Sequence, residues 1–243
     1  MSVPVRIVTL LVAFAAVVAG AAFIVVHYIG GTGGTLPTVD YSKAASGGQV
    51  NLVLQEDPQN NSSTKPDWVS YFVKKPGANP FAQSSWVHTT LFKVPQNTRV
   101  NVTIYGYDGC TPPRNNFWAQ AQGTTGNVLA FQQFNNPGKP KGPMHVTPTL
   151  NGWSHCAVGH TFAIPGLNLF VPVGSPDASA SLCGDSPCVT GPYTLEKFSF
   201  RSPSHAGVWR WQCFVPCGGG FLDGNGGPMQ TLGYMAGEME VTA

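Results

Sequence analysis

Apolar and polar residues alternate along most of the chain, in short runs that end at glycine, proline or small polar residues. This two-residue period is typical of β-strands with one buried face. The predicted strands cover residues 49–55, 68–74, 85–94, 98–107, 159–164, 194–201, 207–213 and 237–242. Many short strands without helical periods between them favour packed sheets or a barrel. We therefore expect an all-β, Greek-key β-sandwich over residues 49–243.

Residues 108–156 interrupt this alternation. They contain the turn-forming pairs Pro112-Pro113 and Pro137-Gly138 and no sustained two-residue period. We expect a long, irregular insertion here. A connection of this length is uncommon in a compact domain unless it has a function.

The N-terminal segment has a different pattern, since Ile7 to Val26 form one apolar run without a charge. A run of about 20 such residues can cross a membrane as a helix. Arg6 precedes the run, which by the positive-inside rule places the N-terminus in the cytoplasm and the rest of the chain outside. We expect a single transmembrane anchor over residues 1–29 of a cell-membrane protein, and a Gly/Thr/Ser-rich linker over residues 30–48. The alternative is a cleaved signal peptide, whose apolar core usually has 7–15 residues.

Charge narrows the choice of partner. Charged residues make up 10% of the chain and the net charge is +2, without the basic stripe that nucleic-acid binding requires. A surface with so few charges favours contact with other proteins, in addition to the membrane. No nucleophile–base pair or carboxylate dyad stands out, so we identify no independent catalytic site.

Six cysteines in a domain expected outside the cytoplasm raise the question of disulfides. Cys183 and Cys188 flank a short loop of glycine, serine and proline, and we expect them to be bonded. Cys110 and Cys156 would pair by elimination. The remaining pair, near the C-terminus, could form a third disulfide or stay as two thiolates, and the sequence leaves both open.

That remaining pair has the composition of a metal site. Cys213 and Cys217 follow the strand predicted over residues 207–213, Met235 lies downstream, and His160 begins another predicted strand. Thiolate and thioether are soft ligands that select copper over hard cations. These four residues are therefore candidate copper ligands.

Strand geometry bears on the environment of Cys213. Trp209 and Trp211 share its face of the predicted strand, because side chains alternate between the two faces. Two indoles should face the core, so we expect Cys213 at the edge of the core, shielded from water. The site also requires His160 to lie at the same end of the sandwich as Cys213.

These segments together resemble the cupredoxin superfamily. The resemblance rests on the hairpin at residues 91–104, the His-Thr-Phe strand entry at residues 160–162, and the cysteine loop followed by methionine. More narrowly, Gly207–Gly218 reads Gly-x-Trp-x-x-Gln-Cys-x-x-x-Cys-Gly and is similar to the binuclear-copper segment of cytochrome c oxidase subunit II. The resemblance is specific over residues 207–218 and loose over the rest of residues 49–243.

The resemblance implies a ligand set and a function. By position, His160 would be the first histidine ligand, and Cys213 and Cys217 would be the bridging thiolates. Met235 would supply the thioether and Val215 the backbone carbonyl. The implied function is single-electron transfer by copper beside a respiratory terminal oxidase. Other subunits of that complex, or a redox protein, would be the partners.

The chain departs from the subunit II pattern at the second histidine. On either alignment its place is taken by Phe221 or by Leu232. The loop that would carry it is longer and rich in glycine, and one membrane helix is expected where subunit II usually has two. His155 could flank the site, and Met229 is an alternative thioether.

Three functions therefore stay open at the level of sequence. One is a membrane-anchored copper protein that relays single electrons, with one copper ion or an atypical binuclear centre. Another is a copper-free, disulfide-stapled accessory or docking subunit of a respiratory complex. The third is copper storage or delivery, in which an incomplete ligand set would help release. Fold alone does not decide between them, because function belongs to the site.

Overall fold

The computed structural model describes residues 3–24, 36–58, 68–109, 113, 115–151, 158–176, 183–217 and 227–243. The chain divides into two units, Met1–Thr35 and Leu36–Ala243. The first contains the helix α1 (Val3–Ile24). No helix among the described residues combines the length and the hydropathy of a membrane span. The transmembrane anchor therefore stays a prediction.

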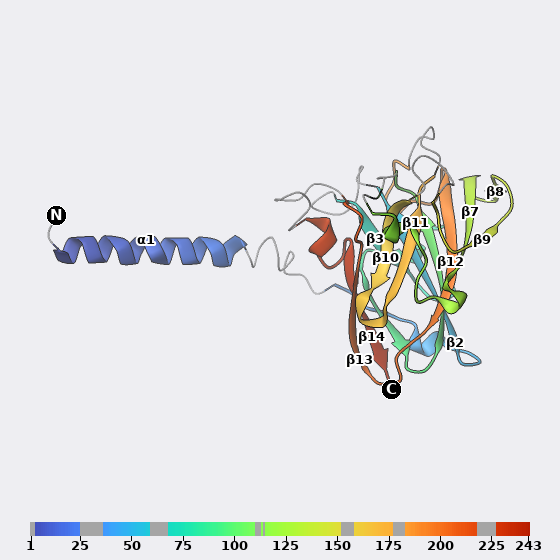
Figure 1. Cartoon of the computed structure of the whole chain (residues 1–243), viewed down its shortest axis with the longest axis horizontal. Helices are drawn as coiled ribbons and strands as arrows, with labels where there is room; N and C mark the ends of the chain where they lie inside the picture. The colour runs from blue at the N-terminus through green and yellow to red at the C-terminus, as the bar shows by residue number, and fades with distance from the viewer. Residues whose placement is uncertain are drawn as a thin grey trace. The chain divides into compact units, whose positions relative to one another are not determined.

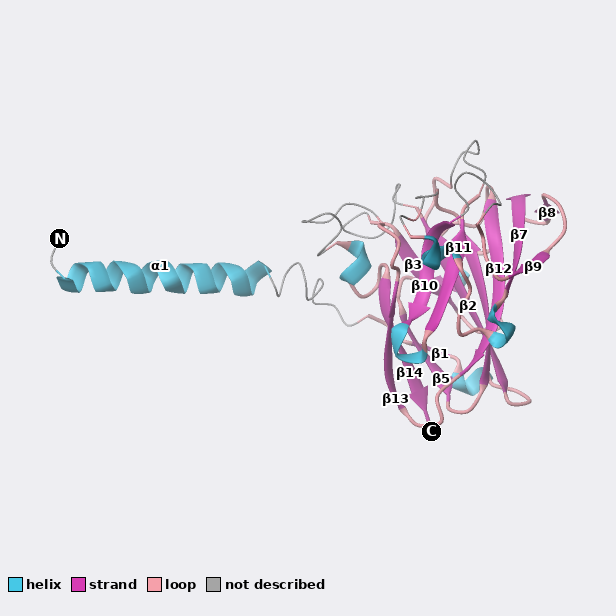
Figure 2. Ribbon diagram, viewed as in Figure 1, coloured by secondary structure: helices cyan, strands magenta, loops and turns pink. Residues whose placement is uncertain are grey.

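The second unit is built from two β-sheets (Figures 1 and 2). The six-stranded sheet has the order β1 (Val39–Asp40), β5 (Leu91–Pro95), β14 (Ala236–Thr242), β13 (Gly207–Gln212), β10 (Val158–Ile164), β11 (Leu169–Gly174). The eight-stranded sheet has the order β4 (Trp86–Val87), β3 (Ser70–Lys74), β2 (Gln49–Asp57), β6 (Arg99–Gly106), β12 (Tyr193–Arg201), β7 (Leu129–Asn136), β8 (Lys139–Pro140), with β9 (His145–Thr147) also paired to β7. Short 3-10 helices cover Ser42–Ala44, Gln83–Ser85, Asn116–Ala119, Thr125–Asn127, Pro165–Leu167 and Pro228–Gln230. The mostly β fold expected from the alternation is confirmed.

The core lies between the two sheets and follows the predicted alternation. In β2 the inward residues Val50, Leu52 and Leu54 are fully buried while Gln49 and Asn51 are exposed. Residues of the same parity on β6 and β10 complete the core. Trp211 is the largest fully buried side chain among the residues that the structure describes. Burial of such large apolar side chains contributes about 1.5–3 kcal/mol each.

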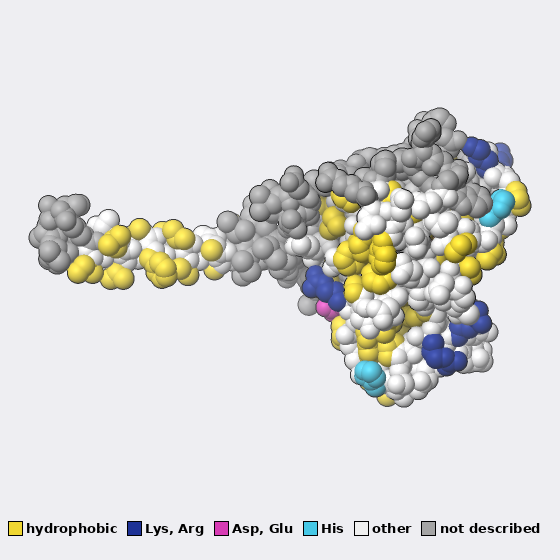
Figure 3. Space-filling model, viewed as in Figure 1, with side chains coloured by type: hydrophobic (Ala, Val, Ile, Leu, Met, Phe, Trp, Pro, Cys, Tyr) yellow, Lys and Arg dark blue, Asp and Glu magenta, His cyan; other side chains and the backbone are white. Residues whose placement is uncertain are grey.

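Charged side chains are few and scattered on the face shown in Figure 3. This agrees with a charged fraction of 10% for the whole chain.

The linker prediction for residues 30–48 is wrong over its second half. The folded unit begins at Leu36, and β1 pairs in parallel with β5 at the edge of the six-stranded sheet. Tyr41, directly after β1, is 1% exposed and its hydroxyl donates to the carbonyl of Lys74. A buried tyrosine that satisfies its hydroxyl is a better guide here than the Gly/Ser content around it.

The strand predicted over residues 85–94 is broken into β4 and β5, which belong to different sheets. Thr89 and Thr90 lie at the crossing and are fully buried. The Thr89 hydroxyl accepts from the Leu91 amide (3.1 Å), and the Thr90 hydroxyl donates to the carbonyl of Ala236 (2.6 Å). Such side-chain hydrogen bonds replace the backbone hydrogen bonds between strands at the point where the chain passes from one sheet to the other.

The irregular insertion predicted over residues 108–156 is also partly wrong, because it contains β7, which pairs with β12 inside the eight-stranded sheet. The Gln-Gln pair in β7 conceals its alternation. The strand β11 was not predicted, and its Pro172 explains why: proline is tolerated in a sheet mainly on an edge strand, and β11 is the edge of its sheet.

Candidate metal centre

His160 enters the site from β10, on the same side as the buried Phe162 and Ile164. The pairing of β10 with β11 shifts register between Val158 and His160, which marks a bulge at Gly159. Bulges re-aim side chains next to functional sites. A Cβ at Gly159 would lie 2.6 Å from Ser175 Oγ and 2.8 Å from the Gly109 carbonyl oxygen, so only glycine fits there.

Cys213 directly follows β13, and its amide donates to the carbonyl of Met235 (2.9 Å). This bond continues the pairing of β13 with β14 by one step. Cys217 lies in the loop that follows. The first part of that loop is fixed by Phe214, whose amide donates to Thr161 Oγ1 (2.8 Å).

The aromatic ring of Phe214 stacks on that of Trp118, with 4.8 Å between ring centroids and 4° between planes. Trp118 belongs to the segment predicted as an insertion. That segment therefore covers the cysteine loop in addition to supplying strand β7.

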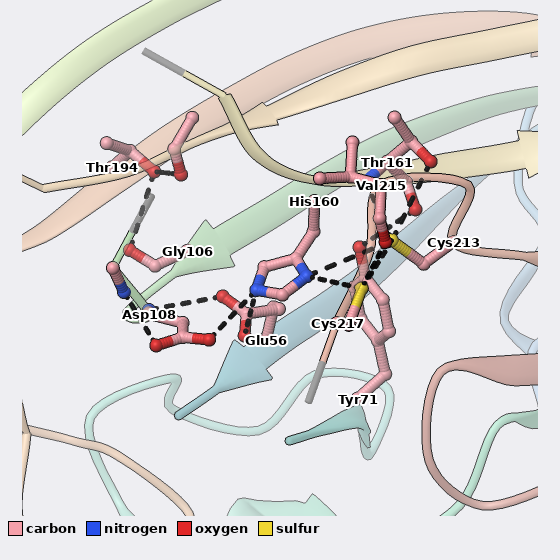
Figure 4. Close-up of polar contacts among 12 residues, drawn as sticks. Glu56, Tyr71, Gly106, Asp108, His160, Thr161, Thr194, Cys213, Val215 and Cys217 are labelled. Atoms are coloured by element: carbon pink, nitrogen blue, oxygen red, sulfur yellow. Dashed lines mark hydrogen bonds and ion pairs between the residues drawn. The ribbon is translucent and has the colours of Figure 1, made fainter. Parts of the chain in front are cut away.

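One edge of the His160 ring faces the two sulfurs (Figure 4). His160 Nδ1 lies 3.0 Å from Cys217 Sγ and 3.8 Å from Cys213 Sγ. The two sulfurs are 2.8 Å apart, and both cysteines are free. The Val215 carbonyl oxygen lies 2.7 Å from Cys217 Sγ and 3.3 Å from Cys213 Sγ. Two sulfurs, one imidazole nitrogen and one carbonyl oxygen thus converge.

The opposite edge of the same ring faces two carboxyl groups (Figure 4). His160 Nε2 lies 3.0 Å from Asp108 Oδ2 and 3.1 Å from Glu56 Oε1. Glu56 comes from β2 and Asp108 from the turn after β6, so both belong to the other sheet. A carboxylate on the second nitrogen of a metal-binding histidine fixes the ring orientation and its tautomer.

The site is shielded from water. Exposed fractions are 0% for Cys213 and Met235, 2% for Cys217 and 3% for His160. Tyr71 and Trp211, both fully buried, are in edge-to-face contact 5.2 Å apart, and the Tyr71 hydroxyl donates to the Thr161 carbonyl (3.4 Å). The expectation that Cys213 begins at the edge of the core agrees with this burial.

The surroundings of the two cysteines shift their pKa values in opposite directions. Burial raises the pKa of Cys217 well above its usual value, and the neighbouring Cys213 adds to the rise. For Cys213, burial is outweighed by hydrogen bonds from Cys217 and His160, so its pKa falls well below the usual value. The Thr161 amide also donates to Cys213 Sγ (3.4 Å). These shifts make Cys213 the more acidic of the two thiols.

The surroundings of His160 shift its pKa in the direction that favours a positive charge. Burial alone would lower the pKa of His160, but the charges of Glu56 and Cys217 and the hydrogen bond to Asp108 raise it well above its usual value. Burial also raises the pKa of Glu56, to about 7, although His160 opposes the rise. These shifts favour the charged form of the His160 imidazole, which lies between the two sulfurs and the two carboxyl groups.

Three of the four predicted ligands come together at their side chains: His160, Cys213 and Cys217. They form one group whose donor atoms lie within 4.8 Å of one another. Met235 is buried and joined to Cys213 through its backbone. The bonded pair Cys183–Cys188 is confirmed. Cys110, Cys156, His155 and Phe221 lie outside the described residues.

Sequence reasoning missed Glu56 and Asp108. The signal for Glu56 was available, because it has the same parity as the core residues Val50, Leu52 and Leu54 of its strand. A carboxylate at an inward-facing position needs a partner. Asp108 carried no such signal, since it follows the strand β6 in a turn.

The donor set suits a soft metal ion. Thiolate sulfur and imidazole nitrogen favour copper or zinc over magnesium or calcium. Two sulfurs bound at about 2.3 Å to one tetrahedral ion would lie about 3.8 Å apart. The observed 2.8 Å means that the sulfurs would separate by about 1 Å on binding a single ion. The residues therefore fit copper in chemistry, with an adjustment at the cysteine loop.

Comparisons with known proteins find similar solved structures at low sequence identity. No protein-family model and no curated protein matches the chain. Similar solved structures include reduced rusticyanin, at 16% identity over 88% of this chain and 91% of that chain, with a TM-score of 0.31. Rusticyanin from Thiobacillus ferrooxidans matches at 16% identity over 84% and 82% of the two chains, also with a TM-score of 0.31.

Proposed function

We propose that this protein is a copper-binding carrier of single electrons, of the cupredoxin type. The observation that carries the proposal is the convergence of two free, buried sulfurs with His160 Nδ1 and the Val215 carbonyl oxygen. Copper bound by such ligands supplies a one-electron couple between its cuprous and cupric states.

The residues of the chain provide what such a couple needs. Cys213 and Cys217 supply soft donors, and the carbonyl of Val215 lies beside both. Met235, fully buried next to Cys213, is the proposed thioether ligand. Glu56 and Asp108 hold the His160 ring in one orientation. The buried aromatic residues exclude water, and a rigid, dry surrounding limits rearrangement when the charge of the site changes.

The finer assignment rests on the sequence. The Gly207–Gly218 motif supports a relation to cytochrome c oxidase subunit II, and we propose that the protein acts beside a respiratory oxidase. The N-terminal apolar run supports attachment to the cell membrane with the β unit outside. The missing second histidine favours a mononuclear or atypical binuclear centre.

One observation favours a second function. The 2.8 Å between Cys213 Sγ and Cys217 Sγ is less than 1 Å longer than a disulfide bond of about 2.05 Å. Oxidation of the pair would remove both thiolates and leave a copper-free accessory subunit. The same two residues therefore decide between the proposals.

Metal analysis combined with visible absorption, on the full chain isolated from its own membrane, tests the proposal. We expect copper in stoichiometric amount and a thiolate-to-copper band that disappears reversibly on reduction. If the site rests as cuprous copper, the band appears only after oxidation. A metal-free, colourless protein in which mass mapping finds Cys213 bonded to Cys217 would contradict it and support the accessory-subunit function.

A further inference from the structure

The His160 ring has two nitrogens, and the copper proposal uses only Nδ1. The other, Nε2, faces Glu56 and Asp108, and the three side chains form a group whose donor atoms lie within 4.8 Å of one another. The sulfurs and the carboxyl groups lie on opposite edges of the ring (Figure 4). The two donor sets are therefore separate in space and different in chemistry.

The hydrogen bonds around this second group are incomplete. The contact of His160 Nε2 with Asp108 Oδ2 (3.0 Å) is a hydrogen bond. Glu56 is fully buried, and its Oε2 accepts from the Asp108 amide (3.2 Å). Its Oε1, aimed at Nε2 from 3.1 Å, accepts no hydrogen bond from any residue that the structure describes. One N–H cannot serve both carboxyl groups well, so Glu56 Oε1 has the charge contact with Nε2 but no hydrogen bond of its own among the described residues.

From these observations we propose that Glu56, Asp108 and His160 Nε2 form a second metal site, for a divalent ion of the zinc type. The imidazole of His160 would bridge this ion and the copper at the sulfurs. The proton now on Nε2 would leave to solvent when the ion binds.

Distances support the choice of ion. Zinc bound to nitrogen and carboxylate oxygen at about 2.0–2.2 Å places those atoms about 3.3 Å apart in a tetrahedron. The observed separations from Nε2 are 3.0 and 3.1 Å, so the required shift is a few tenths of an ångström. The sulfur pair, by contrast, must open by about 1 Å for an ion of the same kind. Calcium and magnesium fit poorly, because they require six or more oxygen ligands or several waters.

The two carboxyl groups differ in exposure. The Asp108 side chain is 22% exposed while that of Glu56 is 0% exposed. In the proposed site the ion would lie closer to solvent on the Asp108 side, and the fourth position of a tetrahedron would be left for water. Three protein ligands and one open position is the usual arrangement of zinc sites that keep a water molecule.

The test removes the sulfurs first, so that only the second site can bind. The full chain carrying C213S and C217S is stripped of metal and titrated with Co²⁺ and Zn²⁺. We expect one equivalent of Co²⁺, with visible d–d bands and without a sulfur-to-cobalt band, and displacement of Co²⁺ by Zn²⁺. Absence of any Co²⁺ binding in this variant would overturn the proposal.

Two further substitutions locate the ion. In the same background, Glu56→Gln should weaken Co²⁺ binding about 100-fold or more, since even residues that only support a ligand cost 10–100-fold. The matched control is Glu196→Gln, the same change at another fully buried carboxyl group, which should leave the affinity unchanged. Equal effects of the two substitutions would contradict the assignment.

Asp108→Asn keeps the test decisive if Glu56→Gln does not fold, because Asp108 is partly exposed. It should weaken Co²⁺ binding to a similar extent while the circular dichroism spectrum stays native. The inference shares His160 with the proposed copper site but does not require copper. If the C213S/C217S variant binds cobalt and the parent contains no copper, only the proposed function is refuted. If the parent contains copper and the variant binds no cobalt, only this inference is refuted.

Discussion

The two cysteine pairs that the structure describes differ in state although they resemble each other in spacing and burial. Cys183 and Cys188 are five residues apart and bonded, whereas Cys213 and Cys217 are free, with 2.8 Å between their sulfurs. All four have exposed fractions of 5% or less. Burial and spacing therefore do not determine whether such a pair is bonded.

The neighbours of each pair account for the difference. The Cys188 amide donates to Asp57 Oδ2 (3.0 Å), and its carbonyl accepts from the side chain of Gln55. These contacts hold a loop in place. The sulfurs of the other pair face the imidazole of His160 and the amide of Thr161, which stabilise a thiolate.

One strand serves both pairs. Gln55 and Asp57 of β2 contact the disulfide loop, while Glu56 between them contacts His160. Consecutive residues of a strand point to opposite faces. One face of β2 therefore supports the disulfide loop, and the other carries Glu56 to the histidine beside the free pair. We interpret the disulfide as structural and the free pair as the candidate metal ligands.

The largest expected effect comes from Cys217→Ser. We expect it to abolish the thiolate-to-copper band and to lower the copper content of the full chain to background, because one of two soft donors is lost. Metal analysis and visible absorption are the measurements. The matched control replaces both Cys183 and Cys188 by Ser and should retain copper. Loss of copper in the control, or a normal band in Cys217→Ser, would break the comparison.

A buried carboxyl group outside both cysteine pairs, Glu196 on β12, gives a prediction about pH. Burial raises the pKa of Glu196 to about 8. The native state keeps this proton after the unfolded state has released it, so Glu196 makes the free energy of unfolding fall as pH rises from about 4.5 to about 8. In Glu196→Gln the free energy of unfolding should decrease less steeply with pH, by up to about 1.4 kcal/mol per pH unit. Urea unfolding of the parent and the variant across this range measures it, and parallel profiles would refute it.

Removal of the bonded pair tests its structural role. Replacing Cys183 and Cys188 by Ser opens a loop of sequence separation 5, for which the chain-entropy model predicts a loss of about 2 kcal/mol. Denaturant unfolding of the oxidised parent and the double variant gives this difference. An unchanged free energy of unfolding would show that the loop is held by Gln55 and Asp57 alone.

The smallest expected effect separates a ligand from a packing residue. Met235 and Met239 are both fully buried, and Met→Leu conserves volume, so each change should cost less than about 1.5 kcal/mol. If Met235 supplies the thioether, M235L alone should shift the visible band and the reduction potential. Identical spectra of M235L and M239L would remove Met235 from the ligand set.

The alternation of the chain predicted most of the fold. Strands such as β6 and β12 lie close to their predicted bounds, because one face of each packs on the core. Prediction failed where another interaction replaces alternation. Examples are the threonine hydrogen bonds between β4 and β5, and the proline in the edge strand β11.

The sequence predicted the ligands on the sulfur side of the His160 ring but not the carboxyl groups on its other side. Soft donors at short spacing mark Cys213 and Cys217, and the strand entry marks His160. Glu56 is about a hundred residues from His160 along the chain, and only the pairing of the two sheets brings them to 3.1 Å. Contacts between sheets depend on register and on the bulge at Gly159, which no local pattern reveals.

X-ray absorption at the copper edge, on the full chain loaded with copper, tests the central claim most directly. The account predicts sulfur scatterers at about 2.3 Å and nitrogen at about 2.0 Å from copper, as expected for thiolate and imidazole ligands. The sulfur contribution should be lost in Cys217→Ser and kept when Cys183 and Cys188 are replaced. A spectrum of the parent with only nitrogen and oxygen scatterers would contradict the account.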